Sequence, residues 1–279
     1  MFLTAVAAAA IAVSARAQVI QAPAGQAYTI ANNVSATAVT EVTYQWYRDG
    51  QPIAGATDSS YLLPAHLAYG TNVMFKRGVV SSTCPGNVIF TNDVNVSFGM
   101  VVGAVNWASV NVAAYQTFAT RPDMYTQFYQ WNRATAWSAT AATVSNWPSA
   151  AITDAAWTIN PCPSGWRLPT QAECQALANS GSTWVAADTR GNAVAGRFFG
   201  ANHQTCTLPN NMFGCLFLPA TGVRGMGSGE LGDQGLYGHF WGITSLSSTN
   251  GHAMYFQSQT IAPNNNINKL YGMTLHCVQ

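Results

Sequence analysis

The side chains that could carry out acid–base chemistry are few. The chain has only ten Asp and Glu residues among 279, and after residue 100 the one close pair is Glu230 and Asp233, in a glycine-rich segment. A glycoside hydrolase needs two converging carboxylates, and a calcium site needs several oxygen ligands. We therefore expect no catalytic pair. Calcium bound by Glu230 and Asp233 stays an alternative to two solvent-facing acids.

Nucleophiles and metal ligands also lack the spacing that such sites require. The sequence has no Gly-x-Ser-x-Gly turn and no Cys-x-x-Cys pair. His239, His252 and His276 could together bind zinc, but their spacing favours separate hydrogen-bonding roles. A reactive cysteine needs a lowered pKa, which Cys174 on an apolar helix face would lack. The sequence thus predicts neither an enzyme nor a metal site.

Aromatic and amide side chains gather instead in the C-terminal third. Aromatic rings can stack on the apolar faces of sugars or anchor a protein interface, while amides bond hydroxyl groups. Two alternatives stay open: Trp241 and Tyr255 belong to the core, and the asparagines are turn formers. The predicted ligand-binding residues are Tyr237, His239, Trp241, Asn250, His252, Tyr255, Gln257, Asn264, Asn265 and Asn266.

The amino-acid composition suits a protein that makes contacts outside the cell. Charged residues make up only 8% of the chain and the formal net charge is +1, so a neutral, hydrogen-bonding surface is expected. The chain has no run of basic residues that could neutralise phosphates, so we do not expect it to bind nucleic acid.

Residues 1–17 are typical of a secretory signal peptide. Residues 2–13 are apolar, and Ala15, Arg16 and Ala17 form a small-x-small cleavage site, although a basic start is missing. A buried Ala-rich helix is the alternative. The apolar run is shorter than the ~20 residues that span a bilayer, and no later segment is longer. We expect a secreted or outer-surface protein, not a membrane-spanning one, that begins near Gln18.

An oxidising compartment makes disulfides the default state of the six cysteines. Cys206 and Cys215 flank a Pro-Asn-Asn turn, which favours a local bridge between them. Cys84 and Cys174 lie in different predicted domains, and either a bridge between them or two free thiols is compatible with the sequence.

Residues 18–99 are predicted to form an all-β domain. The run TYQWYRDGQPI (residues 43–53) alternates as a strand does and contains the tight-turn pair Asp49 and Gly50. This run resembles bacterial immunoglobulin-like domains, with Trp46 as the buried tryptophan of the sandwich. The resemblance implies a spacer that carries the second domain.

Residues 160–174 are the most informative stretch of the second domain. Pro161 and Pro163 stiffen a loop around Cys162. Thr170 is then a helix N-cap, and Glu173 completes a capping box. The pattern predicts a short helix over residues 171–179 that ends at Ser180 and Gly181.

Several motifs of residues 100–279 occur in the order typical of one family. They are VNWA (105–108), FYQWNR (128–133), CPSGWRLPT (162–170), LPATGVR (218–224) and the closing YG (271–272) and CV (277–278). In these motifs the segment resembles the Fibrobacter succinogenes major paralogous domain, which occurs in secreted and surface proteins of the Fibrobacteres and Bacteroidetes.

The resemblance implies a C-type-lectin-like and formylglycine-generating-enzyme-like α+β fold with long loops, and no established reaction. It also implies a disulfide between Cys162 and Cys277. The chain departs from the family at His276, where an Arg is usual, and at Gly242, where the usual sequence is aromatic-Trp-Ser-Ser.

Strands are expected at residues 101–107, 191–199, 212–218, 240–245, 252–257 and 272–277, together with two short helices. Glycine-rich residues 222–238 and asparagine-rich residues 263–268 are expected to be loops. In a lectin-like fold such loops carry recognition.

These observations predict a two-domain, non-enzymatic binding protein, an adhesin or appendage-tip protein that recognises a glycan or a protein. The alternative is a structural component of a surface layer or filament. Because asparagine codons are adenine-rich, Asn264 to Asn266 are also compatible with diversification by a retroelement.

Overall fold

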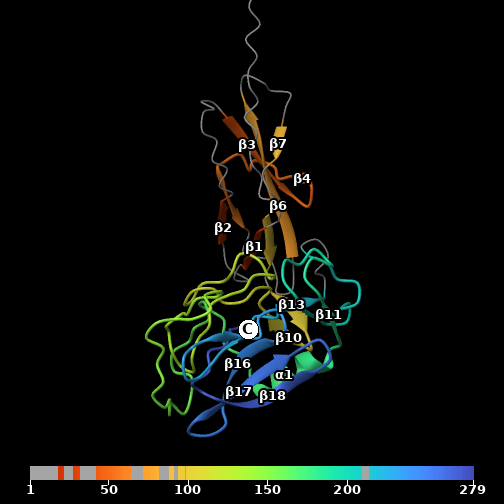
Figure 1. Ribbon diagram of the computed structural model, residues 1–279. Helices are drawn as coiled ribbons and strands as arrows, with labels where there is room; N and C mark the ends of the chain where they lie inside the picture. The colour runs from red at the N-terminus through yellow and green to blue at the C-terminus, as the bar shows by residue number, and fades with distance from the viewer. Residues whose placement is uncertain are drawn as a thin grey trace, which may run out of the picture. The chain divides into compact units, whose positions relative to one another are not determined.

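The computed structural model describes residues 18–21, 28–31, 42–63, 72–81, 88–90, 94–97, 99–208 and 214–279. Strands dominate these residues, and they contain a single α-helix where two were expected. The described chain divides into two compact units, one within residues 29–95 and the other formed mainly by Val96–Gln279 (Figure 1). The predicted signal peptide and Cys84 lie outside the described residues.

Eight strands lie between residues 18 and 97. They are β1 (Gln18–Gln21), β2 (Tyr28–Ala31), β3 (Val42–Arg48), β4 (Gln51–Pro52), β5 (Ser60–Leu63), β6 (Asn72–Ser81), β7 (Val88–Phe90) and β8 (Val94–Ser97). One sheet has the order β1-β8-β6-β3-β4, with β7 also paired to β6, and β2 pairs with β5. The described residues of this segment contain strands and turns and no helix, as expected.

Trp46 is the centre of the N-terminal unit. Its side chain is fully buried, and its indole N–H donates to the Asp58 carbonyl oxygen at 3.0 Å. Asp49 and Gly50 both have positive φ, which matches the tight turn between paired β3 and β4. The buried tryptophan and the Asp-Gly turn are therefore confirmed.

The second unit contains several small sheets. Its strands are β9 (Met100–Val102), β10 (Val105–Trp107), β11 (Ser182–Val185), β12 (Gly196–Phe199), β13 (Leu216–Pro219), β14 (Val223–Arg224), β15 (Leu231–Gly232), β16 (Gly238–Ser245), β17 (Asn250–Phe256) and β18 (Ile261–Asn268). They form the sheets β9-β10, β11-β12-β13, β14-β15 and β16-β17-β18. Residues 272–277, expected as a strand, make only isolated bridges, including those of Met273 to Tyr129 and Thr274 to Phe240.

The helix α1 (Gln171–Asn179) has the predicted bounds and the predicted capping box. The Thr170 backbone N–H donates to Glu173 Oε2 at 2.8 Å, and the Glu173 N–H donates to Thr170 Oγ1 at 3.3 Å. Arg167 adds a bidentate pair to the same carboxylate at 2.8 and 2.6 Å. Burial alone would raise the pKa of Glu173, but these hydrogen bonds outweigh burial and hold that pKa below its usual value.

The β16-β17-β18 sheet separates two hydrophobic clusters, because side chains alternate between its faces. Trp241 and Ala253 point into a cluster with Tyr129, Trp131 and Leu275. Phe240, Met254 and Phe256 point the other way, into a cluster with Cys174 and Leu177 of α1. Figure 1 shows α1 lying beside this sheet.

Two glycines let this sheet accept large rings. A Cβ at Gly251 would lie 2.3 Å from the Trp131 ring, and one at Gly238 would lie 2.3 Å from the Phe256 ring. Both positions therefore need glycine for close packing and not for backbone freedom.

Two segments expected to be loops contain strands. Residues 263–268 lie within β18, because their backbone pairs with β17. Residues 222–238 contain the short paired strands β14 and β15. Local composition indicated turns in both places, and strand pairing overrode it.

Candidate functional site

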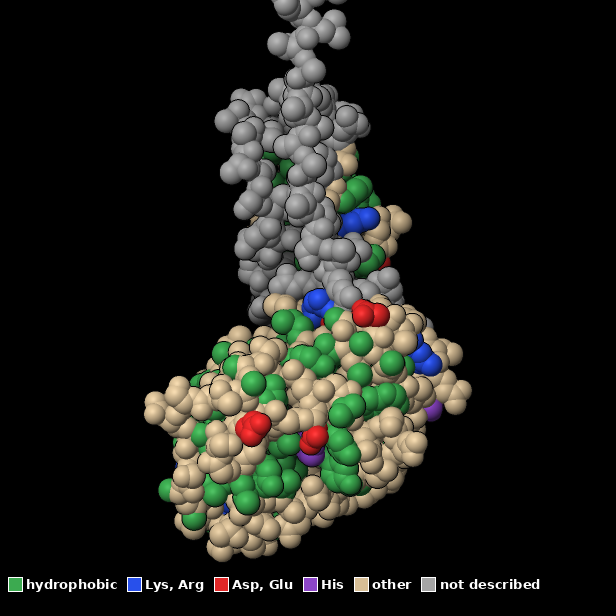
Figure 2. All heavy atoms as spheres, in the orientation of Figure 1, with side chains coloured by type: hydrophobic (Ala, Val, Ile, Leu, Met, Phe, Trp, Pro, Cys, Tyr) green, Lys and Arg blue, Asp and Glu red, His purple; other side chains and the backbone are tan. Residues whose placement is uncertain are grey.

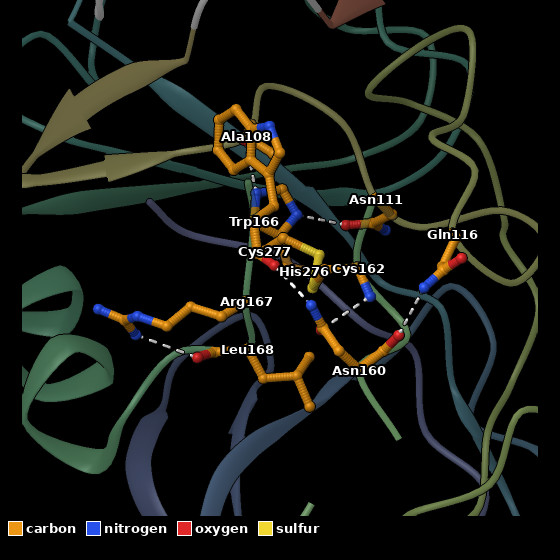
Figure 3. The surroundings of a disulfide bond; sticks show 10 residues. All are labelled: Ala108, Asn111, Gln116, Asn160, Cys162, Trp166, Arg167, Leu168, His276 and Cys277. Carbon is orange, nitrogen blue, oxygen red and sulfur yellow. Dashed lines mark hydrogen bonds between the residues drawn. A yellow bond between two sulfur atoms is a disulfide. The ribbon is translucent and has the colours of Figure 1, made fainter. Parts of the chain in front are cut away.

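A disulfide joins Cys162 to Cys277, as the family resemblance implied, with 6.1 Å between the two Cα atoms. Figure 3 shows its surroundings. Asn160 closes the loop by donating from its amide nitrogen to the Trp166 carbonyl oxygen at 2.8 Å. The backbones of Arg167 and Val278 exchange hydrogen bonds at 2.9 and 2.8 Å. Residues 160–170 are therefore tied to the last strand-like segment by covalent and hydrogen bonds.

His276 is a structural residue beside this disulfide. Nε2 lies 2.6 Å from the Ala108 carbonyl oxygen, which can only accept, so Nε2 carries the proton. Burial lowers the pKa of His276 to about 4, and its Nδ1 lies 2.6 Å from Asn111 Oδ1. Both ring nitrogens of His276 thus contact an oxygen of residues 108–111.

The structure also defines the state of three further cysteines, Cys206, Cys215 and Cys174. Cys206 and Cys215 are bonded, which confirms the local bridge. Cys174 is a buried free thiol. Burial, together with the nearby Glu173 charge, raises the pKa of Cys174 to about 12, so this thiol lacks the thiolate character that a nucleophile needs.

The acids and histidines considered as metal ligands do not converge. Glu230 and Asp233 are both exposed, and the described residues contain no group of three or more His, Cys, Asp or Glu side chains that could hold a metal ion. His252 is fully buried, and its Nε2 donates to the Pro263 carbonyl oxygen at 2.8 Å. A Cβ at Gly242 would lie 2.1 Å from His252 Nδ1. The missing side chain at Gly242 thus makes room for this histidine.

Trp241 belongs to the core. It is fully buried, its ring meets Trp131 edge-on at 5.4 Å, and its indole N–H donates to the Tyr129 carbonyl oxygen at 2.9 Å. Of the two interpretations open for Trp241, the structure thus places this residue in the core, away from solvent.

Tyr237, His239 and Tyr255 do come together. His239 and Tyr255 are direct cross-strand partners on β16 and β17, with ring centroids 5.7 Å apart and nearly parallel planes. The Tyr237 ring lies 5.9 Å from that of His239 and 6.4 Å from that of Tyr255, so the three rings contact one another in a triangle. Both tyrosines are half-buried, so each keeps part of its ring in contact with solvent. We call these three residues the ring stack.

The imidazole of the ring stack lacks hydrogen-bond partners. Only 9% of His239 is exposed, and both ring nitrogens are buried without a partner among the described residues. Burial lowers the pKa of His239 to about 4, against a smaller opposing effect of the Asp233 charge. The ring is therefore neutral, with one donor and one acceptor that no described residue satisfies.

The predicted amides are dispersed. Asn250 begins β17, and Gln257 follows β17, where its carbonyl oxygen accepts from Arg197 at 3.0 Å. Asn264 donates to Gln175 of α1 at 2.8 Å. Asn265 is half-buried, and Asn266 is exposed opposite His252. These amides thus serve the β18 and α1 region and do not border one pocket.

Buried cations hold the loops around this sheet, a role that the sequence did not suggest. Lys269 is fully buried, and its Nζ donates to the carbonyl oxygens of Asp154 and Ser247 at 2.8 Å and to Ser245 Oγ at 2.9 Å. Arg224 is also fully buried and donates to the carbonyl oxygens of Ser138 at 2.6 Å and Ala141 at 2.8 Å. The available signal for Arg224 was its place at the end of the LPATGVR motif (218–224), and Lys269 lies in none of the motifs.

Figure 2 shows one face of the molecule, where uncharged polar and apolar side chains prevail and acidic side chains occur singly. Comparisons with protein-family models, curated proteins and solved structures found no match to this chain.

Proposed function

We propose that this chain is a non-enzymatic binding protein that acts outside the cytoplasm, and that the ring stack is its ligand-contact site. In this proposal an immunoglobulin-like spacer precedes a lectin-like domain of the Fibrobacter succinogenes major paralogous kind. The observation that carries the proposal is the ring stack itself: two half-exposed tyrosines contact each other and a neutral histidine whose two nitrogens have no partner among the described residues.

Other observations support the setting. The described residues contain two disulfides, which persist in oxidising compartments. No helix among the described residues is long and apolar enough to cross a membrane. Rings of this kind supply contact area at low entropic cost, for a glycan or for a protein chain.

The test compares wild type with Tyr237→Ala/Tyr255→Ala in a glycan array and in an adhesion assay on cells. We expect the double variant to bind at least about tenfold more weakly, since losing an anchoring ring costs more than ~1.4 kcal/mol. Tyr115→Ala is the matched control, because Tyr115 is an exposed tyrosine in the same unit.

Unchanged binding by the double variant would refute the assignment of the ring stack. A wild-type protein that binds nothing and assembles with itself would instead favour a filament or surface-layer component.

A further inference from the structure

Residues 134–153, which contain no helix or named strand, carry a second aromatic surface. The rings of Trp137 and Trp147 lie 5.1 Å apart with a 54° tilt. Both side chains are half-buried, and neither belongs to the two large clusters on the faces of the β16-β17-β18 sheet. Two tryptophans thus pair at the surface without contributing to the main core.

The backbone and glycine contacts fix both rings. Trp137 and Phe128 exchange backbone hydrogen bonds at 3.1 and 2.9 Å. The Trp147 indole N–H donates to the Met226 carbonyl oxygen at 3.2 Å. A Cβ at Gly229 or Gly272 would lie 2.5 or 2.6 Å from the Trp147 ring, so backbone packs directly against it.

Hydrogen bonds from a neighbouring segment fix the loop that carries Trp137 and Trp147. Arg224 binds the carbonyl oxygens of Ser138 and Ala141, and Gln234 donates to the Ala139 carbonyl oxygen at 2.8 Å. The Leu231 backbone N–H donates to the Ala142 carbonyl oxygen at 2.9 Å. A surface ordered in this way loses little conformational freedom when a ligand binds.

The side chains of residues 134–153 favour a neutral, hydroxyl-bearing ligand. Residues 134–153 contain no ionisable side chain, so a charged ligand would find no counter-ion on them. Their exposed members are mainly Ala, Ser, Thr and Asn, including Thr140, Thr143 and Asn146. The Ser, Thr and Asn side chains among them can hydrogen-bond hydroxyl groups and make the surroundings of the two rings more polar than those of a protein hot spot.

We propose that Trp137 and Trp147 form a second binding surface, for neutral sugar rings, with Met226 at its edge. The C–H faces of a sugar pack on the indole rings, and the hydroxyls bond the Ser and Thr groups of residues 138–149. Met226 is 45% exposed and borders the pair through its backbone contact with Trp147. This inference is independent of the ring stack.

The experiment measures binding to neutral hexasaccharides (β-1,4-glucan, α-1,4-glucan and β-1,4-mannan) and to an anionic oligogalacturonate, by tryptophan fluorescence and calorimetry. Trp137→Ala and Met226→Glu are expected to weaken binding of a neutral hexasaccharide at least tenfold. Because Trp147 fills space against two glycines, Met226→Glu provides a variant whose altered side chain is not needed for packing. Tyr115→Ala serves as the control.

Three results would overturn the proposal: no neutral hexasaccharide bound by wild type, undiminished binding by both variants, or stronger binding of the anionic oligomer. Tyr237→Ala/Tyr255→Ala separates the two sites. Loss only in that double variant supports the ring stack and refutes the tryptophan surface, and loss only in the tryptophan-surface variants does the reverse.

Discussion

His239 and His276 show how burial sets the charge state of single residues in this protein. The pKa of each is lowered to about 4, with burial as the main cause. An unfolded histidine has its usual pKa near 6.5. The unfolded chain therefore binds these two protons at a higher pH than the folded chain does.

This difference predicts a pH-dependent stability. The stabilisation is complete above pH ~6.5 and is lost as the pH falls from ~6.5 toward ~4, by up to ~1.4 kcal/mol per pH unit for each histidine. Urea unfolding at pH 7.5, 5.5 and 4.5 measures it. His239→Phe removes one of the two titrating groups, so the stability should fall less steeply with pH, by up to ~1.4 kcal/mol per pH unit. Tyr237→Phe should leave the decline in stability unchanged. An equally steep decline in both variants would contradict the burial argument for His239.

At the scale of elements, the loops of the second unit are held in part by buried cations that meet backbone carbonyl oxygens, in addition to cations such as Arg133 and Arg167 that pair with carboxylates. Lys269 binds the segments near Asp154 and residues 245–247, and Arg197 binds the carbonyl oxygens of Gln257 and Ser258 at 3.0 Å each. A chain with only ten acids can hold long loops in this way without an acid for every base.

Lys269→Met tests this role. Methionine keeps the aliphatic volume but leaves several buried oxygens without a donor, so we expect the second unit to lose about 3 kcal/mol of stability. Urea unfolding gives the magnitude, and limited proteolysis should find faster cleavage near residues 245–249. Arg133→Met is the control: Arg133 pairs with Asp154 at the surface and is 40% exposed, so its loss should cost under about 1 kcal/mol. Equal costs would argue against the special role of Lys269.

Some of these elements could be predicted from the sequence and others could not. The helix at Gln171–Asn179 depends on Thr170 and Glu173, which are neighbours in sequence, so its bounds were predicted correctly. Residues 263–268 depend on pairing with the preceding strand β17, and the position of Trp241 depends on Trp131, which lies far from it along the chain. Local composition cannot specify such partners. The buried roles of Lys269 and Arg224 could not be predicted from the sequence for the same reason.

At the scale of the whole molecule, the two disulfides close loops of very different length. Cys162–Cys277 spans 115 residues and Cys206–Cys215 spans 9. In the chain-entropy model the long bridge stabilises by about 5 kcal/mol and the short one by about 3 kcal/mol.

Replacing each pair by alanine should therefore lower the stability unequally. We expect Cys162→Ala/Cys277→Ala to cost roughly 2 kcal/mol more than Cys206→Ala/Cys215→Ala, measured by urea unfolding under non-reducing conditions. The short-bridge variant is the matched control. A cost that is equal or reversed would show that native packing, and not loop length, sets the value of these bridges.

The bridges of residues 272–278 reach back to Trp107, Tyr129, Arg167, Arg224 and Phe240. A ribosome makes this segment after all of those partners, so the nascent domain cannot close while its earlier parts emerge. Under the proposed function, this delay keeps the polypeptide extended for export, and the Cys162–Cys277 bridge can form only after Cys277 has been made.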